Sequence, residues 1–541
     1  MKNLISTILF WGLIIVNLQA QQTNIVDKKN QAIQLESFIK SDNPELWGNL
    51  RKGIYDVGYH VAYEYDSSRT VKSKYNYLNE LVTGNVFRPV QISVWYPSSL
   101  SANDQTMQYS EYIITRKTRF DYSLLNKKDI KNLINAFKKS VNWYNTSENK
   151  NNDFAELIIN RETQAYKDAS PYPGKFPLIL FCSGGGDTPD SFDVLFEYLA
   201  SHGYIIAAIP SNGMYKKSPS YNTIDEESQT RDMELAMLFM HKFVNADINN
   251  VCSMGYSYGG IVNVLFALRN FDIKTVLCLD GSICLIDRDR AVKNLAYFNP
   301  TNLRVPFMNL TGKQTPDHDF TFYNSLKYSD AYLLHFNNLV HYEFKSVPII
   351  RNFENFKSDE NSNISSIKYD NEIAYEYILK FLDSYMKNDS ESELFIQNKP
   401  ELNGITNGVV TVEFKKALDI PPTGTHFIEL VENEGVDKGV EVYNKAKMSD
   451  STIVMFGENE INTLGYKFLN EGLTDEAIKI FQLYVLEYPL VSNSYDSLGE
   501  AYERNNEHRE ALWNYKKALE INPNSISAKR AIQNITEILN K

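Results

Sequence analysis

Between residues 176 and 336 the sequence alternates continuous apolar runs with helical patterns. The apolar runs predict strands at Phe176–Phe181, Tyr204–Ile209, Asn250–Met254, Ile273–Leu279, Val305–Leu310 and Tyr332–Phe336. The intervening patterns predict helices at 191–201, 230–244 and 259–269, with a closing helix at 372–386. Strands that are apolar throughout are buried on both faces, which occurs when helices cover both sides of a parallel sheet. The chain therefore predicts an α/β fold, a mostly parallel sheet flanked by helices.

The first twenty residues have the pattern of a signal peptide. Lys2 provides a basic start, Leu4 to Val16 form an apolar run, and Ala20 precedes the expected cleavage point. The run is shorter than the roughly 18 to 20 apolar residues of a spanning helix. We expect residues 1–20 to be removed and the mature chain to be exported, periplasmic or extracellular, with no transmembrane anchor. The alternative is an uncleaved membrane anchor.

Charge and cysteine content exclude other classes of protein. The chain has 55 basic and 67 acidic residues, a net charge of −12, whereas nucleic-acid-binding proteins usually carry a basic excess. Only four cysteines occur in 541 residues, in or beside apolar runs and without metal-site spacing. We therefore predict no nucleic-acid partner, no metal site and no disulfide scaffold.

The chain divides into a long α/β part and a shorter helical part. We assign residues 21–388 to the α/β domain. Residues 113–165 have the pattern of an insertion with polar helices at 127–143 and 153–162, which would form either a lid or a surface decoration. Residues 389–457 are assigned to a linker and helical connector, with a helix pair at 427–447.

Residues 458–541 contain an internal repeat. Positions recur at an offset of 34 residues: Leu464-Gly465 as Leu498-Gly499, Glu476-Ala477 as Glu510-Ala511, and Pro489 as Pro523. Small residues at such positions let the two helices of a hairpin approach closely, and proline ends the second helix. The register resembles the tetratricopeptide repeat, which implies an all-α domain that binds a protein partner or docks onto the α/β domain.

A G-x-S-x-G motif marks the candidate nucleophile. Gly255-Tyr256-Ser257-Tyr258-Gly259 follows a predicted strand and precedes a predicted helix. In this context the serine sits on a sharp turn at the end of a sheet strand, where the neighbouring glycines give it room. Ser257 is therefore the predicted nucleophile.

A nucleophilic serine needs a histidine base. Where the serine lies on such a turn, the order along the chain is serine, acid, histidine, so the base comes last. His341 comes shortly after the last predicted strand, in a loop at the carboxyl edge of the sheet, where sites form on parallel sheets. His318 and His335 are the alternatives. His335 lies within the last strand, where a histidine is usually structural.

The acid and the oxyanion hole are expected in loops of the same edge. Asp280 directly follows the strand after the nucleophile helix, and Asp317 is the alternative in the next loop. The alternative is that Asp280 has only a structural role, as part of a turn-forming Asp-Gly pair. The N–H groups of Tyr258 and of Gly185, in a run of three glycines, are the predicted oxyanion donors.

Several stretches resemble the α/β-hydrolase superfamily, and within it the platelet-activating-factor acetylhydrolases and dienelactone-hydrolase-like esterases. The resemblance covers about residues 50–388 and rests on 177–186, 199–209, 255–260, 340–344 and Arg88-Pro89. It implies Asp280 as the acid and His341 as the base. One departure is Ser183-Gly184, where the family has His-Gly. A serine nucleophile also argues against dienelactone hydrolase activity itself, which uses cysteine.

These features predict an exported serine hydrolase that cleaves a small carboxylic ester, with short acyl chains implied by the resemblance and no cofactor. One alternative is a peptidase or amidase on the same fold. The other is a non-catalytic adaptor that binds partners through its repeats.

Overall fold

The computed structural model of the protein describes residues 45–71, 86–116, 118–119, 125–141, 158–214, 218–270, 272–285, 287–288, 290–313, 318–351 and 364–540. The expected signal peptide, residues 1–20, and the alternative acid Asp317 lie outside these ranges. Across the described ranges, no helix combines the length and the apolar character that a membrane crossing requires. The chain forms two compact units, Met1–Ala417 and Leu418–Lys541.

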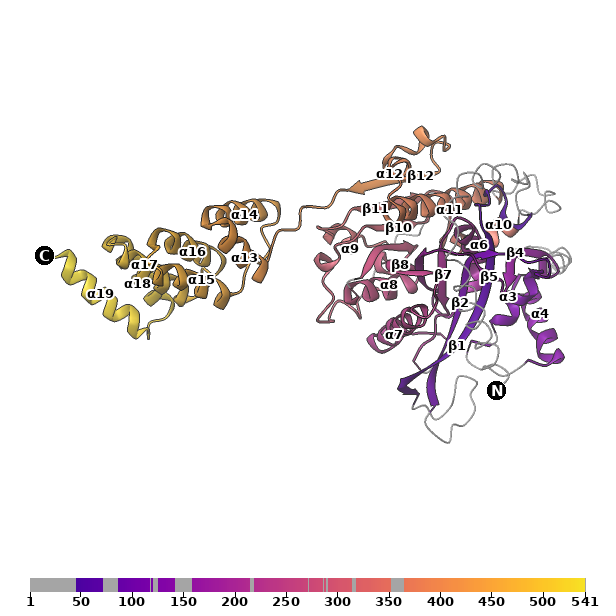
Figure 1. Ribbon diagram of the computed structural model, residues 1–541, viewed down its shortest axis with the longest axis horizontal. Coiled ribbons are helices and arrows are strands. Elements are labelled where there is room, and N and C mark those ends of the chain that lie inside the picture. The colour runs from indigo at the N-terminus through magenta and orange to yellow at the C-terminus, as the bar shows by residue number, and fades with distance from the viewer. Residues whose placement is uncertain are drawn as a thin grey trace, which may run out of the picture. The chain divides into compact units, whose positions relative to one another are not determined.

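The first unit is built on one mixed sheet (Figure 1). Its strands, in spatial order, are β12 (Val410–Lys415), β11 (Ala331–Phe336), β10 (Phe307–Thr311), β9 (Ile273–Leu279), β8 (Ala246–Tyr256), β6 (Phe176–Cys182), β7 (Ile205–Ile209), β2 (Val86–Ser99), β1 (Asp56–Val71), β4 (Glu162–Lys167) and β3 (Thr106–Gln108), with β5 (Ser170–Pro171) paired to β2. From β11 to β7 all neighbouring strands pair in parallel, so their carboxyl ends share one edge. The loops that carry the predicted site residues all leave from that edge.

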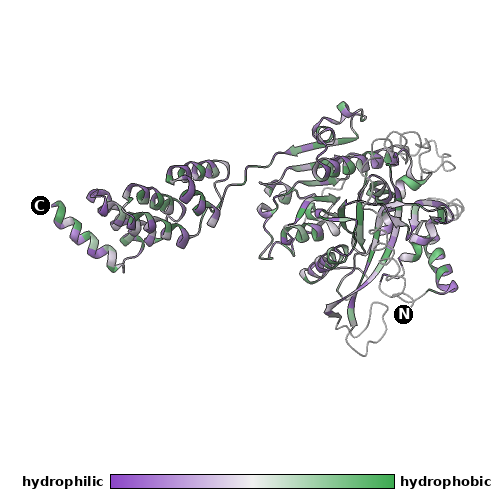
Figure 2. Ribbon diagram, in the orientation of Figure 1, coloured by the Kyte–Doolittle hydropathy of each residue, from purple (hydrophilic) through white to green (hydrophobic). Residues whose placement is uncertain are grey.

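Helices cover both faces of this sheet. The helices α6 (Asp193–Ser201) and α11 (Ile364–Lys387) pack into one apolar core, and α7 (Thr223–Met240) and α8 (Gly259–Arg269) pack into the other. Helices α6 and α8 are buried along almost their whole length, and Figure 2 shows hydrophilic as well as hydrophobic residues on the helices of this unit. The predicted fold class, a mostly parallel sheet flanked by helices, is confirmed.

Short helical segments complete the first unit. They are η2 (Glu45–Trp47), α3 (Tyr109–Thr115), α4 (Lys127–Val141), η4 (Pro189–Phe192), η5 (Ser282–Cys284), η6 (Pro300–Asn302), α9 (Thr321–Ser325), η7 (His341–Phe344), α10 (Val347–Arg351), α12 (Ser390–Gln397) and η9 (Pro400–Asn403). Segment η5 comes shortly after the predicted acid, Asp280, and η7 begins at the predicted base, His341.

Several elements depart from their predicted bounds, among them helix α7 and strand β4. Helix α7 begins at Thr223, seven residues before the predicted start, and the Asn222 side chain caps it by accepting from the N–H of Asp225. Its first turns bury polar residues, including Glu226 and Gln229, so they carry no apolar periodicity. At the end of the insertion, Glu162 begins strand β4 rather than ending a helix, and β4 pairs with β1.

The sheet continues past the predicted end of the first domain at residue 388. Strand β12 pairs antiparallel with β11, and Ile396, Ile405 and Val410 are buried in the same core. The compact unit therefore extends to Ala417. The 389–457 segment consequently does not act as one linker, since its first part is an edge of the sheet.

The second unit is all-helical. Its helices are α13 (Thr425–Glu434), α14 (Val436–Ser449), α15 (Glu458–Asn470), α16 (Thr474–Glu487), α17 (Ser492–Arg504), α18 (His508–Ile521) and α19 (Ile526–Leu539). Both ends of α15 and α16 recur 34 residues later in α17 and α18, which matches the offset in the sequence. A side chain at Gly465 would collide with the ring of Phe481, and one at Gly499 would press on Tyr515, so both glycines allow close helix approach.

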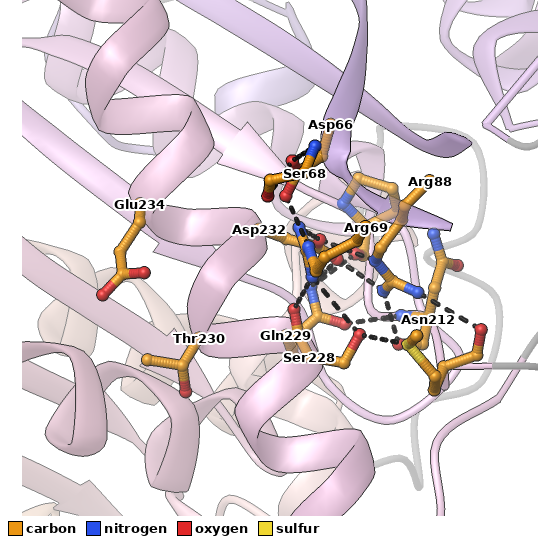
Figure 3. A network of polar contacts seen from close by, with 12 residues as sticks. Asp66, Ser68, Arg69, Arg88, Asn212, Ser228, Gln229, Thr230, Asp232 and Glu234 are labelled. Carbon is orange, nitrogen blue, oxygen red and sulfur yellow. Dashed lines mark hydrogen bonds and ion pairs between the residues drawn. The ribbon is translucent and has the colours of Figure 1, made fainter. Parts of the chain in front are cut away.

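A buried ion-pair network fixes the β1–β2 hairpin to α7 (Figure 3). The Arg88 guanidinium is fully buried, with Nε 2.7 Å and Nη2 2.5 Å from the two carboxylate oxygens of Asp232. Arg69 Nη2 lies 2.7 Å from the same carboxylate. Arg88 also donates to the carbonyl oxygens of Asn212 and Gly213, in the loop after β7. One aspartate thus holds two arginines and, through them, a loop at the carboxyl edge of the sheet.

We expect Asp232→Asn to lower the free energy of unfolding by about 3–5 kcal/mol, because it leaves buried guanidinium charge without its partner. Denaturant unfolding measures the change. Glu234→Gln on the same helix is the control, since Glu234 pairs with the partly exposed Arg269 and such pairs contribute about 1 kcal/mol or less. Equal losses in the two variants would contradict this account of the network.

We expect a chain ending at Ala417 to keep a cooperative thermal transition close to that of the first unit in the full protein. A chain ending at Asn388 should melt at a clearly lower temperature. It exposes the edge of β11 and loses buried side chains such as Ile396, each of which contributes about 1.5–3 kcal/mol. Differential scanning calorimetry of the two truncated chains makes the comparison. If both melt alike, β12 is not part of the stable unit.

Candidate active site

Ser257 lies on a strained turn between β8 and α8. Its φ is 53°, in the left-handed region that residues with side chains seldom adopt, and such strain is found most often at functional sites. The turn is possible because its flanks lack side chains. A Cβ at Gly255 would collide with the carbonyl oxygen of Gly259, and a Cβ at Gly259 with that of Cys182. Backbone bonds to β9 and to η5 hold the turn: the Ser257 N–H donates to Leu279, and its carbonyl accepts from Ser282.

The predicted serine, histidine and aspartate form one hydrogen-bonded chain. His341 Nε2 lies 2.9 Å from Ser257 Oγ, and His341 Nδ1 lies 2.5 Å from Asp280 Oδ2. The three residues come from the loops after β8, β11 and β9, which the parallel register brings to one edge. In this geometry Nδ1–H donates to the carboxylate, which leaves Nε2 as the acceptor that faces the serine hydroxyl.

Asp280 is held as a buried carboxylate. It is 1 % exposed, and burial alone would raise its pKa. The neighbouring side chains of His318 and His341 and the N–H of Gly312, 3.2 Å from Oδ1, outweigh burial and hold the pKa well below its ordinary value. Asp280 is therefore an anion at neutral pH, the form that orients an imidazole.

The glycine loop after β6 lies against the nucleophile turn. A Cβ built on Gly184 would be 3.2 Å from the Cβ of Ser257, and one on Gly185 would be 3.7 Å from the Cβ of Tyr258. Within the described part of the chain, neither the Gly185 N–H nor the Tyr258 N–H donates a hydrogen bond. Tyr258 also directly precedes α8, where unsatisfied N–H groups favour negative charge. These two donors suit an oxyanion beside Ser257.

Long-range contacts fix the continuation of this loop. Lys345 Nζ lies 2.6 Å from Asp187 Oδ2, which ties the glycine loop to the segment that carries His341. Burial raises the pKa of Asp187, but Lys345, together with hydrogen bonds from Ser191 and the Thr188 N–H, outweighs burial and lowers this pKa. Arg119 donates to the carbonyl oxygen of Gly186 at 3.1 Å, and Arg116 pairs with Asp190. The first residues of the predicted insertion therefore brace the glycine loop.

Tyr256 packs against the imidazole of His341. Its ring stacks on that of His341, with centroids 4.9 Å apart and planes at 24°. The Tyr256 hydroxyl donates to the carbonyl oxygen of His341 at 2.9 Å. The residue before the nucleophile thus restrains the histidine through both its ring and its hydroxyl.

Of the two alternative bases, neither reaches the serine in a hydrogen bond. His335 Nδ1 lies 3.1 Å from Thr311 Oγ1. His318 Nε2 lies 3.9 Å from Oδ1 of Asp280, the carboxylate oxygen that His341 does not contact. Sequence reasoning missed the roles of Asp187, Lys345 and Arg119. No local pattern marks them, because each pairs with a residue distant in the chain. Among the described residues, no cluster of His, Cys, Asp and Glu is arranged to hold a metal ion.

Comparison with known proteins found one family model and solved structures that are similar to this chain. Residues 165–289 match the family model described as chlorophyllase, a span that includes Ser257 and Asp280 but ends before His341. A solved ferulic acid esterase from Streptomyces cinnamoneus is similar with a TM-score of 0.41 and 17% identity, over 67% of this chain and 97% of that chain. The sequence has no match among curated proteins. The family match supports a hydrolase of carboxylic esters.

Proposed function

We propose that the protein is an exported serine hydrolase that cleaves small carboxylic esters. The observation that carries the proposal is the continuous chain from Ser257 Oγ through His341 to the buried Asp280, beside the N–H groups of Gly185 and Tyr258, which donate to none of the described residues. A non-catalytic adaptor would have no need for this geometry. Export rests on the pattern of residues 1–20, and short acyl chains rest on the resemblance to the acetylhydrolases.

Each atom of the chain has a role in the proposed reaction. Ser257 Oγ attacks the ester carbonyl while His341 Nε2 takes the hydroxyl proton. The carbonyl oxygen becomes an oxyanion that accepts hydrogen bonds from the N–H groups of Gly185 and Tyr258, each worth about 10²–10³ in kcat. His341 then gives the proton to the leaving alcohol, and a serine ester remains. Water activated by His341 hydrolyses that ester and restores the enzyme.

Asp280 acts on the histidine rather than on the substrate. As an anion it accepts the Nδ1–H, selects the tautomer with a free Nε2 and stabilises the imidazolium that forms during each proton transfer. No step in this sequence needs a cofactor. An amide could react through the same steps, so a peptidase or amidase is the second candidate. An amide differs because its leaving amine must receive the proton from His341 before it departs.

The helical unit has a separate role in this proposal. Every group in the proposed chemistry lies before Ala417, whereas the helices from α13 to α19 form their own cores. We assign that unit to binding a protein partner.

Ser257→Ala should abolish turnover of p-nitrophenyl acetate, because the acyl group has no acceptor. The thermal transition should stay or rise slightly, since the substitution removes only a hydroxyl. A fluorophosphonate probe should label the wild type at Ser257, as mass spectrometry of the labelled peptide will show. Labelling at another serine, or undiminished turnover in the variant, would overturn the mechanism.

Asp280→Asn should reduce kcat by about 10⁴-fold, because an amide favours the wrong imidazole tautomer. Asp317→Asn is the matched comparison and should change kcat little. Steady-state kinetics on the same ester distinguish the two. The reverse ranking would assign the acid to the loop after β10.

A further inference from the structure

The carboxylate of Asp280 lies between two histidines. Its Oδ2 is 2.5 Å from His341 Nδ1, and its Oδ1 is 3.9 Å from His318 Nε2. The N–H of Gly312 also donates to Oδ1, at 3.2 Å. The proposed reaction uses only His341, so the position of His318 beside the same anion needs its own explanation.

The backbone and ring of His318 are held independently of that contact. The backbone forms an isolated bridge with Leu285, and the next N–H, of Asp319, donates to the carbonyl of Cys284 at 2.9 Å. The imidazole stacks on Phe320, with centroids 5.2 Å apart and planes at 26°. These contacts fix the ring with its Nε2 toward Asp280.

The Nε2 atom of His318 is a buried polar atom with no hydrogen bond to any described residue. Leaving such an atom unsatisfied has a cost of about 1–3 kcal/mol. At 3.9 Å from Oδ1, it is slightly beyond hydrogen-bond length but within range of strong electrostatic attraction to a desolvated carboxylate. Among the described residues, Asp280 is the carboxylate that faces this atom.

A third imidazole, that of His335, lies near Asp280 and His318. His335 on β11 has its ring centroid 6.2 Å from that of His318 and bonds Thr311 through Nδ1. Burial lowers the pKa of His335, and nearby His318 lowers it further, while Asp280 and Glu413 on β12 oppose both effects. Among the described residues, the carboxylates that act on His335 are therefore Asp280 and Glu413, and Asp280 has His341 and His318 beside it.

We propose that His318 is a positioning residue that shares Asp280 with His341. It holds Oδ1 from the side opposite the triad and takes up part of the carboxylate's negative charge. This inference rests on the proposed function, since it concerns how the acid of that site acts on its base.

Sharing the carboxylate has a consequence for pH dependence. A carboxylate stabilises the imidazolium form of its neighbour, and a second donor or cation on the same carboxylate weakens that effect. Removing His318 should move the acidic limb of the kcat/KM profile to higher pH.

The experiment compares His318→Phe and His318→Gln with the wild type in the full-length protein. Phenylalanine keeps a ring on Phe320 but has no polar atom, whereas glutamine retains an N–H donor and cannot carry charge. His335→Gln is the matched control, since it alters the neighbouring imidazole and preserves a partner for Thr311. The pH profile of kcat/KM for p-nitrophenyl acetate, with kcat and KM separated, is the readout, and melting temperatures check the fold.

We expect His318→Phe to lower kcat about tenfold with little change in KM, and to shift the acidic limb upward by about half a pH unit or more. His318→Gln should recover most of kcat and part of the position of the limb, because its N–H can donate to the same carboxylate. His335→Gln should move the limb less than His318→Phe does. If His318→Phe leaves the limb in place, whether or not kcat falls, His318 is only structural and the inference is wrong. If instead Ser257→Ala keeps the wild-type activity, the proposed function itself fails, whatever the His318 variants show.

Discussion

The structure of the site depends on one steric constraint, the fit of the Ser257 turn between β8 and α8. A residue with a side chain occupies the left-handed region there, which is costly unless the surroundings enforce it. Gly255 and Gly259 make the enforcement possible, because any side chain on either would meet a backbone carbonyl. The same close approach brings the nucleophile, the helix terminus and the glycine loop after β6 to one point.

Around this turn the site is assembled by contacts between loops that are far apart in the chain. Lys345 connects the histidine segment to Asp187, and Arg119 fastens the glycine loop from the opposite direction. In a separate network, Asp232 binds two arginines, and one of them, Arg88, holds the loop after β7. The ion pairs of Asp232 are buried, so they act mainly to define geometry: a charge that lost its partner there would be strongly destabilising.

The two units follow different physical rules. The first has long-range order, since β12 returns from beyond residue 400 to complete the edge beside β11. In the second, packing is between neighbours along the chain, with each glycine of the 34-residue register admitting an aromatic ring from the adjoining helix. Such repeats propagate one surface along the array, which suits the partner-binding role that we propose.

The sequence by itself determined the class of fold, because apolar strands and helical periods are local patterns that reflect burial on two faces or one. It also singled out Ser257, whose glycine spacing is a local requirement, and the repeat with its period. The sequence favoured His341 over His318 and His335 because of its place in a loop, but only the tertiary structure brings its Nε2 to hydrogen-bond distance of Ser257 Oγ. The tertiary structure likewise decided that β12 belongs to the sheet and that Asp232, Asp187 and His318 have the partners described. Those pairings join residues separated by tens to hundreds of positions, and no local pattern encodes a distance between two loops.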